Sequence, residues 1–367
     1  MLAGAVASLL VASAHGCGID LAGTAPGARD GAASEASLPP VAEGGIATDA
    51  AVEAATDGSV VDCGDVATSP KNCGACGHDC LGGTCSAGKC QPLVLANNDP
   101  GLGAVAIDAT TIYYVAENAS VIRKLPVTGG PIVDVHFTGT APHALVLDGD
   151  RISWDDQFGA GTFVFASGEK RQDFTSGVRA LAKTAGGLYM VTSLSIEYWN
   201  RDLTQSLRTF GQTGSSPAIV VDDTYAYWSS TLQIRRVGIG DDAVANVVTG
   251  LTAVPTSMAI DATYVYWTTS TKVLRATKAV GTGWTVTELV TGETSAAALE
   301  VDATGLYWIS LGSGNVRHAP LAGGAAVTLA TTGVQLTSPS FQHMIALSPT
   351  AIYFASTIDG TLSRLAK

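Results

Sequence analysis

Six cysteines within a short stretch of the chain could bind a metal ion or pair with one another. Five lie in NCGACGHDCLGGTCSAGKC, and the six are Cys63, Cys73, Cys76, Cys80, Cys85 and Cys90. The two-residue spacing in CGAC, with His78 nearby, suits a tetrahedral zinc site. A zinc ribbon would repeat that spacing after a longer gap, which this sequence does not do. An even number of closely spaced cysteines favours three disulfides, so we predict no metal and leave the connectivity open.

Three other side chains could form a site because they occupy the same position in a sequence repeat. His143, Arg179 and His343 each lie five residues before the turn position of their unit. Together they could bind an anionic or metal-associated ligand, or a histidine could act as a general base near neutral pH. The alternative is that they are polar residues at strand starts, since no carboxylate pair recurs beside them. We predict these three as ligand-binding candidates and assign no catalytic residue.

The repeat consists of an apolar run, a turn opened by Asp and an aromatic strand, as in AIDATYVYW and EVDATGLYWI. The turn positions, at intervals near forty, are Asp108, Asp148, Thr184, Asp222, Asp261, Asp302 and Ser348. Such a period with short strands is typical of β-propeller blades. We therefore predict an all-β, seven-bladed propeller of four-stranded antiparallel blades, with six or eight blades as alternatives.

The final unit ends after its third strand, whereas the first unit is preceded by a surplus strand, QPLVLANN at 91–98. We expect this N-terminal strand to pair with the last blade and close the ring, because closure removes open sheet edges.

Aromatic pairs such as Tyr266-Trp267 could form a sugar-stacking surface. Adjacent residues of a strand face opposite sides of the sheet, and both sides of a blade pack against neighbours, so we predict that both aromatics are buried. The recurring aspartates could likewise form a calcium ring. We predict turn-capping instead, because an Asp side chain can accept backbone amides two residues on, and each lies in a separate blade.

The N-terminal region has the features of an exported protein. Residues 2–12 form an apolar run of signal-peptide length. SAHGC resembles the lipobox of bacterial lipoproteins, which would make Cys17 the lipidated N-terminus; ordinary secretion with cleavage after Ala14 is the alternative. We expect a lipoprotein signal peptide at 1–16, a lipid anchor and disordered acidic tether at 17–61, a cysteine-rich module at 62–90 and the propeller at 91–367.

The net charge of −12 argues against a nucleic-acid partner. The VYW, AYW and LYW strands with a following Arg resemble the YWTD and NHL types of β-propeller. The whole layout is similar to a group of myxobacterial surface lipoproteins, which implies a fold and a location without a substrate.

We therefore expect a monomeric cell-envelope lipoprotein, held to the membrane by its lipid anchor only, whose propeller binds a protein or glycan without catalysis or a cofactor. The alternative is a lyase or lactonase that resembles the virginiamycin lyase or gluconolactonase propellers, with its site at the channel mouth. A structural spacer is a third possibility.

Overall fold

The computed structural model describes residues 62–99, 101–156, 158–173, 177–211, 218–280, 284–331 and 343–367. The predictions of a signal peptide, a lipidated Cys17 and a tether concern residues 1–61 and lie outside these ranges. Within them, no helix is long and apolar enough to cross a membrane.

The cysteine-rich module contains three disulfides, which confirms the prediction of disulfides over zinc. The pairs are Cys63–Cys76, Cys73–Cys85 and Cys80–Cys90. Its two short strands, β1 (Cys85–Ser86) and β2 (Lys89–Cys90), form a hairpin. With so few apolar residues, the module depends on cross-links and on its contact with the propeller for stability.

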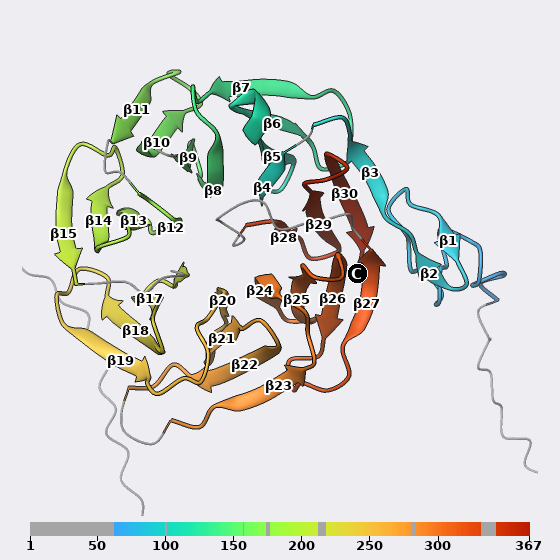
Figure 1. The fold of residues 1–367 in the computed structure, drawn as a ribbon. Helices are drawn as coiled ribbons and strands as arrows, with labels where there is room; N and C mark the ends of the chain where they lie inside the picture. The colour runs from blue at the N-terminus through green and yellow to red at the C-terminus, as the bar shows by residue number, and fades with distance from the viewer. Residues whose placement is uncertain are drawn as a thin grey trace, which may run out of the picture. The chain divides into compact units, whose positions relative to one another are not determined.

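Seven four-stranded antiparallel sheets follow one another around a ring within the described residues, as predicted (Figure 1). Blades 1 and 2 comprise β4 (Leu102–Ile107), β5 (Thr111–Ala116), β6 (Val121–Pro126), β7 (Val133–Phe137), β8 (Pro142–Asp148), β9 (Arg151–Asp156), β10 (Gly159–Val164) and β11 (Lys170–Asp173). Blades 3 and 4 comprise β12 (Ala180–Lys183), β13 (Gly187–Val191), β14 (Ile196–Asn200), β15 (Ser206–Phe210), β16 (Ile219–Val221), β17 (Tyr225–Ser230), β18 (Gln233–Gly238) and β19 (Val244–Val248).

Blades 5 and 6 comprise β20 (Ser257–Ile260), β21 (Tyr264–Thr268), β22 (Lys272–Thr277), β23 (Thr287–Thr291), β24 (Ala296–Asp302), β25 (Gly305–Ser310), β26 (Asn315–Ala319) and β27 (Val327–Thr331). Blade 7 comprises β28 (Ile345–Leu347), β29 (Ala351–Ser356), β30 (Thr361–Ala366) and β3 (Leu93–Ala96). A short 3₁₀ helix, Glu117–Ala119, joins β5 to β6.

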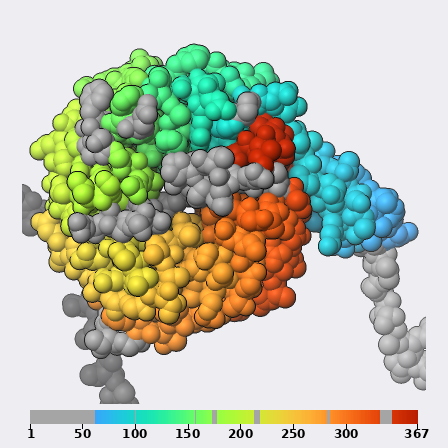
Figure 2. Space-filling model, in the orientation of Figure 1, coloured from blue at the N-terminus to red at the C-terminus, as the bar shows by residue number. Residues whose placement is uncertain are grey.

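The ring is closed by the N-terminal strand β3, which supplies the outermost strand of blade 7. It pairs antiparallel with β30, with Leu93 opposite Arg364 and Val94 opposite Ser363. Figure 1 shows the cyan β3 beside the dark red β30. Figure 2 shows the atoms of consecutive blades packed side by side, from green through yellow to orange. The first and last parts of the propeller therefore share one sheet, as the surplus N-terminal strand predicted.

The aromatic pairs are buried between blades, as predicted. Tyr227 and Tyr266 are fully enclosed, and so are Trp228 and Trp308. In the blades that carry such a pair, the two aromatics face opposite neighbours, so Tyr227 packs with Trp267 of the next blade and Trp228 with Tyr189 of the preceding one. This double-sided burial explains why the strands that carry these pairs are almost entirely apolar.

The turn aspartates act as backbone acceptors, which confirms the turn-capping prediction for Asp108, Asp222, Asp261 and Asp302. In the turn after β20, for example, one carboxylate oxygen of Asp261 accepts the amides of Thr263 and Tyr264, each at 2.7 Å.

Basic side chains on the third strands connect neighbouring blades. Arg275 donates to the main-chain oxygen of Leu321 in the next blade at 2.8 Å, and Arg236 donates to that of Lys278 at 2.7 Å. Arg364 makes the equivalent bond across the ring closure, to the oxygen of Val127 at 2.5 Å. These charge-assisted bonds hold successive blades in register near the turns between third and fourth strands.

Candidate functional site

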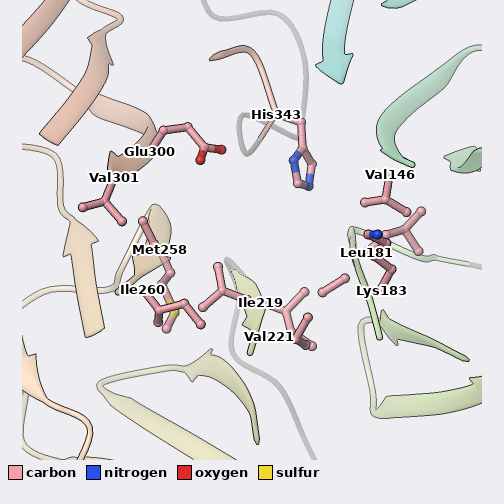
Figure 3. A pocket seen from close by; sticks show the side chains of 13 residues that line it. Val146, Leu181, Lys183, Ile219, Val221, Met258, Ile260, Glu300, Val301 and His343 are labelled. Atoms are coloured by element: carbon pink, nitrogen blue, oxygen red, sulfur yellow. The ribbon is translucent and has the colours of Figure 1, made fainter. Parts of the chain in front are cut away.

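A cavity of about 330 Å³ lies along the innermost strands of the ring. Its walls are mainly aliphatic, with side chains from β8, β12, β16, β20 and β24 (Figure 3). Three titratable side chains also line it: Lys183, Glu300 and His343. A concave apolar space with a few polar groups is the usual form of a small-molecule site.

The structure assigns different surroundings to the three predicted site residues. His343, which precedes β28, lines the cavity. His143 lies near the start of β8, and Arg179 immediately precedes β12 with its side chain exposed. Neither belongs to the described cavity wall. A shared site for the three stays a prediction.

His343 points into the cavity with an uncharged ring. Burial lowers its pKa to about 4, although a hydrogen bond from the ring to the carbonyl of Leu181 acts in the opposite direction. Its Nε2 is buried and has no hydrogen-bond partner. In the tautomer with the proton on Nδ1, which fits the contact with Leu181, Nε2 presents a lone pair. A low pKa also disagrees with the expected base near neutral pH, and a neutral ring supplies no charge to an anion.

Glu300, on β24, is a cavity residue that the sequence analysis missed. Its side chain points toward the same space as His343 (Figure 3). Burial alone raises its pKa to about 8, with no compensating hydrogen bond or charge. The part of the side chain that remains accessible faces the inside of the channel, where protein surrounds it. The carboxyl group is therefore mostly protonated at neutral pH.

A signal for Glu300 was present in the repeat. The residues two positions before the turn are Ala or Val in every other unit, namely Ala106, Val146, Ala182, Val220, Ala259 and Ala346. Glu300 is the exception, and Lys183 is the exception one position later. The ammonium group of Lys183 lies 3.6 Å from a carboxylate oxygen of Asp148, so this positive charge has a partner at the turn.

A buried carboxyl group, Asp155 on β9, positions the start of β8. It accepts the backbone amide of Ala144, and the amide of His143 also contributes to its environment. Burial nevertheless raises its pKa to about 7. Asp155 thus contacts the main chain at His143, which gives it a positioning function.

One face of the ring, here called the mouth face, carries the starts of the innermost strands and the turns between second and third strands. Pairing of Pro142 with Asp156 places the β9–β10 turn at this face. Large apolar side chains are exposed in these turns in four blades: Phe158 (51% exposed), Leu194 (72%), Leu232 (39%) and Ile358 (49%). We call them the apolar turn residues. The corresponding turn of blade 5 has small polar residues, and in that of blade 6 Leu311 is buried, so the exposed apolar side chains are confined to part of the face.

In the described part of the chain, Cys73, Cys80 and Cys90 form a group with the proximity expected of metal ligands. All three are disulfide-bonded, so they offer no thiolate to a metal.

The fold and cavity define a seven-bladed β-propeller with an apolar central channel. No protein-family model and no curated protein matches the chain. Among solved structures, the WD40 repeats of RRP9 match with a TM-score of 0.60 and 11% identity, covering 75% of this chain and 97% of that one. A streptogramin B lyase matches at 0.57 and 14%, covering 75% and 96%. BamB from Moraxella catarrhalis matches at 0.50 and 14%, covering 78% and 88%.

At such low identity these similarities show the fold alone. They support the resemblance to YWTD- and NHL-type propellers at that level. Membership of the myxobacterial lipoprotein group stays a prediction.

Proposed function

We propose that this chain is an exported, lipid-anchored binding protein whose propeller recognises a protein partner through its mouth face. The observation that carries this proposal is the set of apolar turn residues, which occupy equivalent turns of four blades on one face of a rigid ring. Exposed large apolar side chains grouped on one surface are typical of protein-binding sites.

The chemistry of the apolar turn residues favours a protein over a glycan. Leu194, Leu232 and Ile358 are aliphatic, whereas sugars are usually bound by flat aromatic rings with hydrogen-bonding groups around them. The aromatic pairs that could have supplied such a platform are buried between the blades. A protein partner would bury the aliphatic side chains, at a gain of roughly 25 cal/mol for each Å² of apolar surface removed from water.

The cysteines support the proposed location outside the cytoplasm. Three disulfides in one small module indicate an oxidising, extracytoplasmic compartment. The six cysteines of the module pair among themselves, which leaves Cys17 available for the proposed lipidation. Mass spectrometry of the mature N-terminal peptide tests this, since an unmodified Cys17 would contradict the anchor.

Site-specific photocrosslinking on intact cells tests the proposed partner surface. A photoreactive phenylalanine at Leu194 or Leu232 is expected to capture the same protein, and Phe158→Asp should abolish both products. The matched control is Leu207, which is 44% exposed but lies on the outer strand β15. Equal capture from Leu207, or products that persist in Phe158→Asp, would contradict a mouth-face site.

The alternative enzymatic function makes a different prediction. A lyase or lactonase that works from the channel mouth would show turnover that disappears in a His143→Ala, His343→Ala double variant. A binding protein would show ligand-dependent stabilisation without turnover.

A further inference from the structure

The central cavity is lined by many aliphatic side chains and by few polar ones. Its walls are aliphatic, from side chains such as Ile219, Met258 and Val301. Within the described lining, the only titratable groups are Lys183, Glu300 and His343. At about 330 Å³ the cavity lies at the small end of the range for ligand sites. A small, largely apolar molecule would therefore fill it.

The carboxyl group of Glu300 has no partner among the described residues. Burial is the single cause that perturbs it, with neither a hydrogen bond nor a neighbouring charge. A carboxylate placed in an apolar space costs several kcal/mol unless it is paired, so such groups usually have a partner or a function. Here the space in front of the group is the cavity itself (Figure 3).

His343 presents a second acceptor to the same cavity. In the tautomer that donates from Nδ1 to the Leu181 carbonyl, the lone pair on Nε2 has no partner. Lys183 could have supplied a donor, but its ammonium group is paired with Asp148. Once Glu300 is ionised, the cavity thus offers two hydrogen-bond acceptors, one of them negatively charged, while the one ammonium group of its described lining is paired.

We propose that this cavity binds a small aliphatic primary ammonium ion, whose N–H groups donate to the Glu300 carboxylate and to Nε2 of His343. The aliphatic part of the ligand packs against Ile219, Met258 and Val301. This site is separate from the apolar turn residues and does not depend on their having a protein partner. An anion fits this cavity less well, because the Glu300 carboxylate would repel it and the one ammonium group of the described lining, on Lys183, is already paired with Asp148. A divalent cation such as Ca²⁺ would need six or more oxygen ligands, and the described lining offers one carboxylate.

Binding should be linked to the protonation of Glu300. The cation favours the ionised carboxylate, so below about pH 8 binding must release the proton that Glu300 carries. The affinity is expected to rise with pH up to about 8 and then to level off. It should fall again near the pKa of the amine itself, at about 10.

Isothermal titration calorimetry on the full chain tests the proposal with n-pentylammonium chloride. The controls n-pentanol and sodium pentanoate have the same chain length without the positive charge. Saturable binding of n-pentylammonium is expected, at least about tenfold tighter than binding of n-pentanol, with no binding of pentanoate. Equal affinities for the amine and the alcohol, or no binding of the amine at millimolar concentration, would overturn the proposal.

Two variants assign the binding to the cavity. Glu300→Gln should weaken binding of n-pentylammonium at least about tenfold and abolish its rise between pH 6.5 and 8.5. The matched control is Glu288→Gln, which alters an exposed carboxylate on the outer strand β23 and should bind like the wild type. His343→Phe keeps an aromatic ring but removes Nε2, so it should weaken binding independently. Unchanged affinity in both cavity variants would refute the site.

Discussion

His78 and Lys367 are 289 positions apart in the sequence, yet Nε2 of His78 lies 2.7 Å from the main-chain oxygen of Lys367. Nδ1 of the same ring lies 2.5 Å from the carbonyl oxygen of Cys73. The ring therefore links the cysteine-rich module to the end of the chain just beyond β30. Together with the bond between Arg364 and the oxygen of Leu81, this contact joins the module to blade 7.

Replacement of His78 by Ala is expected to lower the free energy of unfolding by about 1–3 kcal/mol, because the ring N–H donates to one of these two oxygens, which would lose its side-chain donor. Urea denaturation followed by tryptophan fluorescence measures the change. The matched control is His318→Ala, which removes a half-buried histidine from the same region, with one contact of 3.3 Å to the oxygen of Thr304, and it should cost less than the His78 variant. Equal losses in the two variants would mean that the His78 contacts contribute no net stability.

The ring closure predicts a second effect on stability. Arg364 is 9% exposed and donates both to Val127 in blade 1 and to Leu81 in the module. Arg364→Met should therefore cost about 2–4 kcal/mol, since two acceptors lose a charged donor. Arg171→Met, which breaks an exposed pair with Glu169, should change stability by less than about 0.5 kcal/mol. Similar midpoints for the two variants would contradict this function of Arg364.

The architecture could be predicted from the sequence because it depends on periodicity. The repeat interval near forty residues gives the number of blades, and the surplus strand at 91–98 predicts how the ring is closed. Burial of pairs such as Tyr266-Trp267 follows from the alternation of side chains along a strand. These features are local or repeated, so a single sequence contains them several times.

The cavity was harder to predict because it depends on single exceptions to the repeat. Glu300 is one acidic residue at a position where the other units have Ala or Val, and its significance appears only when β24 is seen to face the channel. The pKa of His343 depends on burial among residues from several blades, which its position in the repeat does not reveal. The disulfide pairing depends on the folded path of the module and could not be derived from spacing.

Peptide mapping without reduction is expected to show the pairs Cys63–Cys76, Cys73–Cys85 and Cys80–Cys90. Trypsin cleaves after Lys71 and Lys89 and so cuts the cysteine-rich module into three peptides. The three disulfides named above would keep these peptides covalently joined. Reduction should release them. A free peptide before reduction, or a different pair after further digestion, would contradict the connectivity.

The raised pKa of Glu300 predicts a loss of stability with increasing pH. The carboxyl group binds its proton more tightly in the folded state, with a pKa of about 8, than in the unfolded chain, where it is about 4.3. Stability from this group is complete below about pH 4 and declines up to about pH 8. Glu300→Gln should therefore raise the melting temperature at pH 8.5 and change it little at pH 4.5. A variant that melts below the wild type at pH 8.5 would contradict the buried environment, and Glu288→Gln is the control.

A fall in pH is expected to lower the stability of the folded protein through His343. Its pKa of about 4 in the folded state lies below the unfolded value of about 6.5, so stability from the neutral ring is complete above pH 6.5 and is lost as the pH falls toward 4. His136, whose ring packs on Trp154 and Phe163, has the same low pKa from burial and should contribute in the same range. His343→Gln should reduce the loss of stability between pH 6.5 and 4.5. Adding His136→Phe in a double variant should reduce this loss further. The two histidines lie in different blades, so their effects on the free energy of unfolding should add. Urea unfolding at both pH values measures this, and an unchanged acid dependence in the double variant would show that neither ring is buried in its neutral form.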